Sequence, residues 1–360
     1  MKAAVYYGRR DIRIEDVPRP EPAGGELLLR VTGVGICGTD ASEYAGGPHM
    51  FPIHRADPVT GHSGPMVPGH EFAGVVAGTG TGVVGFTEGD PVACGAGISC
   101  GACVPCTLGR TNLCERYSTV GLQRNGALAE FTTVPASACV NLRDRTLTSD
   151  VAAMAQPMSI AAHAVARGRL GAGEHAVVVG TGGIGAFVVH AAARLGAEVT
   201  GVDLDAGRLE VAAALGAHST VAARHRTPLA DLLPDSAPGV VFECTGVPAM
   251  VPESTDLVRP GGRIVVVGLQ KEPVAVDLRS LALREKELIG TLAHTIEADF
   301  GRATELLESG GDVWRLVAPA VLPLESLLVG GLLPMVNGDP TPIKTLFDPR
   351  IDSPRPLVTG

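Results

Sequence analysis

The feature that most restricts the fold is a regular alternation of apolar and alanine-rich runs over residues 152–295. The apolar run HAVVV leads through a glycine-rich turn into IGAFVVHAAARLG, and AEVTGVD then leads into AGRLEVAAALG. Two further apolar runs, GVVFECTG and GRIVVVG, continue the series. Strands that alternate with helices at this period form a parallel sheet with helices on both faces. We therefore expect an α/β fold with a doubly wound parallel-sheet domain at residues 152–295.

The first turn of this domain predicts a dinucleotide site. Gly180, Gly182 and Gly185 form G-x-G-x-x-G after a strand and before a helix. Such glycines allow a tight turn and close backbone approach, and the free N–H groups of the helix attract a pyrophosphate. These features together indicate a Rossmann domain. The alternative is a purely structural turn. The cofactor-binding residues predicted in and around this turn are Gly180, Gly182, Gly183, Ile184 and Gly185.

Two residues beyond the turn bear on the choice of cofactor. Asp203 ends the next apolar run, where a carboxylate accepts hydrogen bonds from the adenosine ribose and repels a 2′-phosphate. NAD is therefore expected rather than NADP. Arg208 follows at the start of a helix, where it either packs along the adenine or is simply solvated.

The remaining chain, residues 1–151 and 296–360, lacks this alternation. A long proline-rich segment at residues 46–68 is a candidate functional loop. The last 60 or so residues are expected to return to the first domain. Runs broken by glycine and proline predict strands at Ile12–Val17, Glu26–Gly35, Phe72–Gly80 and Ala127–Pro135, and a helix is expected at Ala152–Ala166.

Charge and hydropathy exclude some partners. The net charge of −9 argues against nucleic acid, which needs a basic surface. No apolar stretch is long enough to span a membrane, and the N-terminus is charged too early for a secretory signal. Four of the eight cysteines gather in one short segment, which favours metal binding in a reducing compartment over disulfides. We expect a cytoplasmic protein that acts on a small molecule.

Those four cysteines predict a structural zinc site in a lobe at about residues 94–115. The spacing C-x2-C-x2-C-x7-C allows four thiolates to surround one tetrahedral zinc with no open position. Such a site performs no chemistry and stabilises a loop by metal binding. The predicted ligands are Cys100, Cys103, Cys106 and Cys114.

A second metal site is predicted from Cys37 in GICGTD and from His70 and Glu71 in PGHEFAG. Cysteine, histidine and carboxylate around an open position suit a catalytic zinc. Asp40 could orient the His70 imidazole from the second coordination shell. Thr39 places a hydroxyl two residues after the metal-binding cysteine, within reach of a zinc-bound oxygen.

The sequence resembles the zinc-containing medium-chain dehydrogenase/reductase (alcohol dehydrogenase) family over essentially its whole length. GICGTD, PGHEFAGVV, SCGACVPCTLGRTNLCE, VVVGTGGIG, VDLDAGRL, VVFECTGVP and GRIVVVG match in order. Among the subfamilies it looks closest to the butanediol, sorbitol and threonine dehydrogenases. The resemblance implies a GroES-like β-rich catalytic domain, completed by the C-terminal segment, around the Rossmann domain.

The resemblance also implies roles for particular residues. Thr39 would open the proton relay, while Cys37, His70 and Glu71 would hold the catalytic zinc. Thr245 and Gly246 would lie near the nicotinamide. Val267 and Gly268 would offer backbone groups to its carboxamide end.

Two positions depart from the family pattern. Gln156 stands where the polyol-type enzymes usually have glutamate at or beside the zinc, so Gln156 is a doubtful ligand and Glu71 gains importance. Ser42 replaces a histidine that often passes the proton outward. Serine can bridge a water but holds no proton at neutral pH. A histidine of the long loop could substitute: His49, His54 or His62.

The expected function is hydride transfer between NAD(H) and a small secondary alcohol, vicinal diol or polyol, with two zinc ions per chain. A more specialised biosynthetic alcohol or cyclitol dehydrogenase is an alternative. A zinc-free reductase would lack Cys37, His70 and the cysteine lobe. A non-catalytic dinucleotide sensor would fit only the changes at Gln156 and Ser42. The resemblance also implies a homodimer or homotetramer.

Overall fold

The computed structural model describes residues 1–224, 227–233 and 237–360. They form two compact units: Met1–Ser159 with His294–Gly360, and Ile160–Ala293. The sequence placed these boundaries at 151/152 and 295/296, so the first lies several residues further along, inside a helix. The C-terminal segment joins the first unit, as expected from its loss of strand–helix alternation.

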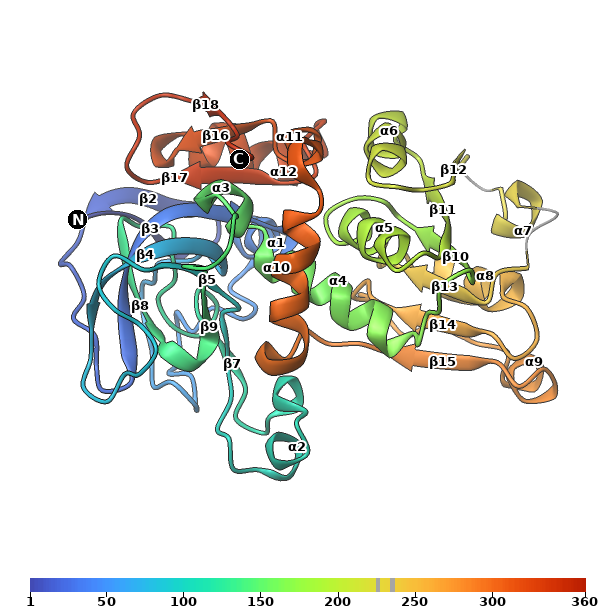
Figure 1. The fold of residues 1–360 in the computed structure, drawn as a ribbon, viewed down its shortest axis with the longest axis horizontal. Coiled ribbons are helices and arrows are strands. Elements are labelled where there is room, and N and C mark those ends of the chain that lie inside the picture. Colours follow the sequence, from blue (N-terminus) through green and yellow to red (C-terminus); the bar gives the residue numbers. More distant parts are fainter. Residues whose placement is uncertain (225–226, 234–236) are drawn as a thin grey trace. The chain divides into compact units, whose positions relative to one another are not determined.

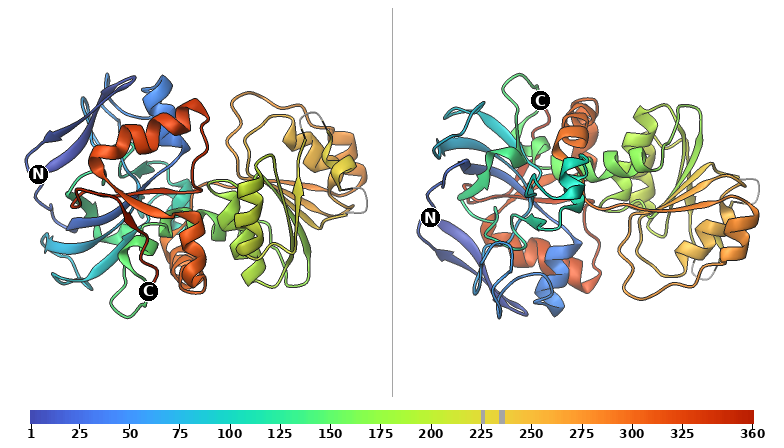
Figure 2. Two further views of the ribbon diagram at one scale, coloured as in Figure 1. Left: turned by 90° about the horizontal axis from the view of Figure 1, so that it is seen from above. Right: turned by 90° about the horizontal axis from the view of Figure 1, so that it is seen from below.

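The second unit is built on a six-stranded, fully parallel sheet. Its order is β12-β11-β10-β13-β14-β15, which is the 3-2-1-4-5-6 order of the Rossmann fold. Helices α5 and α6 cover one face and α7 and α8 the other (Figure 2). Its elements are β10 (His175–Val179), α5 (Gly185–Arg194), β11 (Glu198–Asp203), α6 (Ala206–Ala214), β12 (Ser219–Ala222), α7 (Leu229–Leu232), β13 (Val240–Glu243), α8 (Met250–Leu257), β14 (Arg263–Val266), α9 (Leu278–Leu283) and β15 (Glu287–Gly290).

The central strands of this sheet are continuous apolar runs because both faces are covered. Val177, Val178 and Val241 have no exposed surface. A strand with one solvated face would alternate apolar and polar residues, whereas a buried parallel strand does not. This burial explains why the apolar runs of the sequence marked the strands so clearly.

The first unit contains an antiparallel-rich sheet that joins both ends of the chain. Its path is β18-β16-β17-β3-β4-β5-β9, with β8 also paired to β3. The C-terminal strand β17 therefore lies beside β3 from the N-terminal part (Figure 1). The strands are β1 (Lys2–Gly8), β2 (Asp11–Asp16), β3 (Glu26–Ile36), β4 (Glu71–Thr79), β5 (Pro91–Cys94), β6 (Gly97–Ile98), β7 (Ser118–Thr119), β8 (Phe131–Pro135), β9 (Cys139–Asn141), β16 (Ala320–Pro323), β17 (Thr345–Asp348) and β18 (Arg355–Pro356).

Short helices surround this sheet and connect its strands. The α-helices are α1 (Gly38–Gly46), α2 (Val104–Thr107), α3 (Ser149–Ala152), α4 (Ala155–Arg167), α10 (Gly301–Glu308), α11 (Trp314–Val317) and α12 (Leu333–Asn337). The chain passes from the first unit to the second within α4. Among the described residues, no helix is long and apolar enough to cross a membrane.

Two predicted elements are shorter or divided in the structure. The predicted strand at Ala127–Pro135 is a strand only from Phe131, because the preceding residues bond to other segments, such as Leu128 N–H to the Pro68 carbonyl. The predicted helix at Ala152–Ala166 is divided into α3 and α4. Pro157 is accommodated in the first turn of α4, where backbone N–H groups have no intrahelical acceptor.

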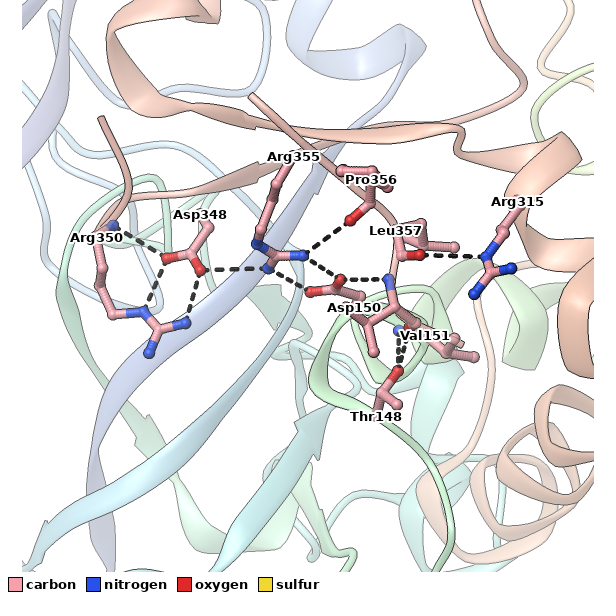
Figure 3. Close-up of polar contacts among 10 residues, drawn as sticks. Thr148, Asp150, Val151, Arg315, Asp348, Arg350, Arg355, Pro356 and Leu357 are labelled. Carbon is pink, nitrogen blue, oxygen red and sulfur yellow. Dashed lines mark hydrogen bonds and ion pairs between the residues drawn. The ribbon is translucent and has the colours of Figure 1, made fainter. Parts of the chain in front are cut away.

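A network of charged side chains fixes the C-terminal segment to the first unit (Figure 3). The Arg355 guanidinium donates to both oxygens of Asp150, at 2.5 and 2.8 Å. The Val358 N–H donates to the same carboxylate at 2.9 Å. Asp348, almost fully buried, accepts hydrogen bonds from Arg350. The chain end is thus held by buried carboxylates next to α3 and β17.

Candidate functional site

The glycine-rich turn after β10 has the conformation that its sequence predicts. Gly180 has a φ of +86°, which favours glycine. A Cβ on Gly185 would lie 1.8 Å from the Gly180 carbonyl oxygen, so no larger residue fits there. Ile184 is the N-cap of α5, and Gly183 faces open space. The free N–H groups at this helix start therefore face a site that the backbone keeps open to an anion.

Asp203 and Arg208 flank this turn. The Thr181 N–H donates to one Asp203 carboxylate oxygen at 2.7 Å, and the Asp205 N–H donates to the other at 3.0 Å. These bonds fix the carboxylate at the carboxyl end of β11. The Arg208 guanidinium lies against Gly182, with Nη1 3.1 Å from where a Cβ would be. Arg208 therefore adds positive charge beside the turn, whereas the sequence left its role open.

The other four predicted cofactor residues all form hydrogen bonds with Glu243, which was not among the residues predicted from the sequence. The Val267 and Gly268 N–H groups both donate to the Glu243 backbone oxygen at 2.8 Å. Thr245 and Gly246 donate to the Glu243 carboxylate. The strand and motif pattern gave no signal for Glu243, because an acid that ends a buried strand looks like any polar residue at a strand end.

The four cysteines of the lobe come together as predicted from their spacing. Their sulfur atoms all lie within 4.8 Å of one another. Cys103 Sγ lies 3.4 Å from Cys106 Sγ and 3.8 Å from Cys114 Sγ. All of these cysteines are free thiols. Four convergent sulfurs in a short loop fit a closed tetrahedral zinc site.

Backbone N–H groups support negative charge on these sulfurs. The Ala102 and Cys103 N–H groups donate to Cys100 Sγ, and they lower the pKa of Cys100 to about 6. Burial raises the pKa of Cys106 to about 12. Metal binding at Cys106 therefore has to release a proton that the apo thiol holds strongly.

Cys37 and His70 meet at the edge where β3 ends and β4 begins. Cys37 Sγ lies 3.1 Å from His70 Nε2. Cys37 also caps α1: its sulfur accepts a hydrogen bond from the Thr39 N–H, and its own N–H donates to Asp40. Zinc–sulfur and zinc–nitrogen bonds of 2.3 and 2.0–2.1 Å put tetrahedral ligand atoms about 3.6 Å apart. The pair therefore needs to open by only ~0.5 Å to hold zinc.

Asp40 completes a buried group with this pair. Its Oδ1 lies 3.7 Å from His70 Nδ1, and the three residues form the second candidate metal cluster among the described residues. Burial lowers the pKa of His70, but the negative charges of Cys37 and Asp40 outweigh it and raise the pKa to about 10. Neither Asp40 Oδ1 nor His70 Nδ1 has a hydrogen-bond partner among the described residues. Buried polar atoms without a partner are uncommon in proteins, and a bound metal ion would explain them here.

Glu71 is not part of this cluster. Its carboxylate accepts two hydrogen bonds from Lys344 Nζ, at 2.5 and 2.7 Å, and both side chains are almost fully buried. A Cβ on Gly35 would lie 2.7 Å from Glu71 Oε2, so glycine makes room for the pair. Lys344 was missed in the sequence because it lies far along the chain from Glu71.

Gln156 has an unusual environment for an amide. It is buried at the start of α4, and its Oε1 has no hydrogen-bond partner among the described residues. An unpaired buried amide oxygen costs free energy that a metal ion could offset. Thiolate, imidazole and amide oxygen are donor types that zinc accepts, and the Cys37–His70 contact brings the first two together.

The predicted relay residues lie on or after α1. Thr39 and Ser42 are three residues apart on this helix and thus share a face, with Thr39 half-buried and Ser42 exposed. His49 and His54 are exposed, and His62 is half-buried. Glu43, which the sequence analysis also missed, is buried and accepts hydrogen bonds from the His49 and Met50 N–H groups, so it shapes the start of the long loop.

Comparisons with known families agree with this architecture. Residues 23–144 match the model for the alcohol dehydrogenase GroES-like domain, and residues 183–309 match the model for zinc-binding dehydrogenases. The chain is 34% identical, over 97% of its length and 98% of the relative, to the 2-dehydro-3-deoxy-L-galactonate 5-dehydrogenase of Pseudoalteromonas atlantica. It is 31% identical, over 86% of each chain, to a sorbitol dehydrogenase of Bacillus subtilis.

Solved structures give the same result and show two cofactors. The 2R,3R-butanediol dehydrogenase from Bacillus subtilis superposes with a TM-score of 0.87 at 27% identity, covering 97% of this chain and 99% of that one. A zinc-binding dehydrogenase from Sinorhizobium meliloti bound to NADP has a TM-score of 0.83 at 28% identity, with the same coverage. An alcohol dehydrogenase from Escherichia coli complexed with NADH has a TM-score of 0.85 at 25% identity, again with the same coverage. The chain therefore belongs to the zinc-containing alcohol dehydrogenase family, and it is an oxidoreductase that acts on CH–OH donors.

Proposed function

We propose that this chain is a zinc-dependent, NAD-linked dehydrogenase of a small secondary alcohol, vicinal diol or polyol. The observation that carries the proposal is the part-buried contact between Cys37 Sγ and His70 Nε2, next to Asp40, whose buried Oδ1 has no hydrogen-bond partner among the described residues. The related dehydrogenases are named for small hydroxylated molecules: 2-dehydro-3-deoxy-L-galactonate, sorbitol and butanediol. This shared chemistry supports the substrate class.

In this proposal Cys37, His70 and Gln156 hold the zinc, and Asp40 orients His70. Gln156 is preferred to Glu71 because the Glu71 carboxylate is already neutralised by Lys344. Bound zinc supplies a Lewis acid that lowers the pKa of an alcohol oxygen. The Thr39 hydroxyl accepts the alcohol proton and passes it to solvent along the helix face that also carries Ser42.

NAD is the proposed cofactor because of Asp203. Its fixed carboxylate at the end of β11 can accept hydrogen bonds from the ribose hydroxyls and repels a 2′-phosphate. A bound nicotinamide dinucleotide would supply the hydride acceptor. Replacing Asp203 with Asn should therefore lower the preference for NAD over NADP, measured as the ratio of the two kcat/KM values.

We also propose a homodimer or homotetramer. Strand β15 lies at the edge of the six-stranded sheet, where its outer backbone groups can pair with another chain. Light scattering coupled to size-exclusion chromatography measures the mass directly. A single monomeric peak at micromolar concentration would contradict this part of the proposal.

The decisive experiment is an alcohol panel with NAD and with NADP, followed by absorbance of the reduced cofactor. The panel should include secondary monoalcohols, vicinal diols, sugar alcohols, cyclitols and deoxy-sugar acids. The matched control is Cys37→Ser, which should lose turnover and one zinc per chain while it still binds NADH. Full turnover by Cys37→Ser would refute the metal assignment. No turnover by the parent chain on the whole panel would favour a dinucleotide-binding sensor.

A further inference from the structure

The carboxyl ends of β13 and β14 are joined by one buried acid. Glu243, the last residue of β13, has no exposed surface. One carboxylate oxygen accepts hydrogen bonds from the Thr245 N–H at 2.7 Å, the Gly246 N–H at 3.1 Å and the Thr245 hydroxyl. The other accepts from Gln270 Nε2 at 2.8 Å. The two turns that follow these strands are therefore bound to the same side chain.

The two turns also approach each other closely around Glu243. A Cβ on Gly268 would lie 2.2 Å from the Gly246 nitrogen and 2.9 Å from Glu243 Oε2. Gly246 has a φ of +66° and lies against the Leu269 backbone. The glycines at these two positions are thus needed for the turns to approach the carboxylate.

The strand order of the sheet predicts that these turns lie beside one half of a bound dinucleotide. Ligands of such sheets lie across the carboxyl ends of the strands, at the point where strand order reverses. Here that point lies between β10 and β13, with Asp203 on the β11 side of it. The adenosine half therefore belongs over β11, and the nicotinamide half over β13 and β14.

We propose that Glu243 is a positioning residue for the nicotinamide, and that its negative charge makes the site favour the oxidised cofactor over the reduced one. The oxidised nicotinamide ring carries a positive charge and the reduced ring is neutral. Among the described residues, no cationic side chain is paired with Glu243, and its hydrogen bonds come only from neutral donors. A buried charge of this kind is poorly screened, so it acts on a nearby cation more strongly than an exposed one would. This role of Glu243 rests on the proposed function, because it assumes that nicotinamide dinucleotide binds here.

The variant Glu243→Gln separates charge from position. The new amide oxygen can keep the bonds from Thr245 and Gly246. Its new NH2 group would face Gln270 Nε2, which is also a donor. Gln270 Oε1, however, has no partner among the described residues and can accept a hydrogen bond. A rotation of the Gln270 amide therefore restores that hydrogen bond. The variant removes the charge and can retain the network.

The experiment measures Kd for NADH by its fluorescence and Kd for NAD by competition, on the zinc-loaded full chain. Glu243→Gln should weaken NAD binding relative to NADH about tenfold, the size expected for loss of a poorly screened unit charge. This ratio corresponds to a shift of about 30 mV in the potential of the bound two-electron couple. Glu253→Gln is the control: Glu253 accepts a hydrogen bond from the Leu229 N–H in the same unit, so this variant removes a carboxylate charge without touching Glu243, and the Kd ratio should not change.

Gln270→Lys provides a second variant if Glu243→Gln fails to fold. It places a cation beside the carboxylate and should change the ratio in the same direction. Equal weakening of both cofactors by Glu243→Gln, or no change in the ratio in either variant, overturns the charge role while leaving the proposed function intact. Failure of the parent chain to bind either cofactor overturns both.

Discussion

Lys344→Met tests whether the Glu71–Lys344 pair is a buried, mutually dependent pair of charges. The side chains are only 2% and 3% exposed, and Lys344 Nζ contacts both carboxylate oxygens. Removing one partner from a buried pair leaves the other charge without compensation and costs about 3–5 kcal/mol. With a urea dependence of about 3 kcal/mol per molar for a unit of this size, the unfolding midpoint should fall by ~1–1.7 M.

The single tryptophan makes the measurement specific to the first unit. Trp314 is fully buried in that unit, and its indole N–H donates to the Leu307 carbonyl at 2.7 Å. Its fluorescence during urea unfolding, at constant free zinc, therefore reports the unit that contains the pair. The double variant Glu71→Gln/Lys344→Met removes both charges and should recover most of the lost stability.

Lys2→Met is the matched control for this experiment. Lys2 pairs with Glu325 in the same unit, but these side chains are 33% and 48% exposed. An exposed pair contributes at most about 1 kcal/mol, so the midpoint should shift by less than ~0.3 M. A shift for Lys344→Met as small as the control's, or a double variant less stable than Lys344→Met, would refute the reasoning.

Three further predictions concern the first unit. Cys106→Ser should lower the zinc content by one per chain in atomic absorption, whereas Cys139→Ser, outside the lobe, should not; equal zinc in both would contradict the four-sulfur site. Arg355→Met should lower the free energy of unfolding by ~1.5–3 kcal/mol, because it removes a charged donor from buried Asp150. The control Arg315→Met changes a largely exposed side chain and should cost less than ~1 kcal/mol. The hydrogen bond from Arg143 lowers the pKa of Asp90 from 3.8 to about 2. This carboxylate stabilises the fold above pH 4 and the contribution is lost as the pH falls through 2, so parent and Arg143→Met should differ in urea midpoint at pH 6 and converge near pH 2. A difference in urea midpoint between the two proteins that grew as the pH fell would contradict this prediction.

The parts of the fold that sequence predicted well are those with local signals. The parallel sheet followed from its buried valine-rich runs, and the four-cysteine cluster followed from spacing along one short segment. Gly180 and Gly185 were recognisable because their backbone geometry excludes other residues. In each case, residues close in the chain determine the feature.

Features that join distant segments were not predictable in this way. No local pattern links Lys344 to Glu71, because the two meet only through the pairing of β17 with β3 and of β3 with β4. Glu243 and Gln270 likewise meet through neighbouring strands of the sheet. The sequence therefore identified the candidate metal-binding residues, but it did not show that the Glu71 carboxylate is already neutralised by Lys344.

The pairing of β17 with β3 also has a consequence for the order of events during translation. All of Ile160–Ala293 emerges from the ribosome before Thr345–Asp348 is made, so the second unit can fold while the first still lacks an interior strand. Until Thr345–Asp348 is made, the Val34–Ile36 part of β3 therefore lacks its β17 partner. During that interval the nascent chain carries an exposed strand edge, and this is when we expect it to depend most on chaperones.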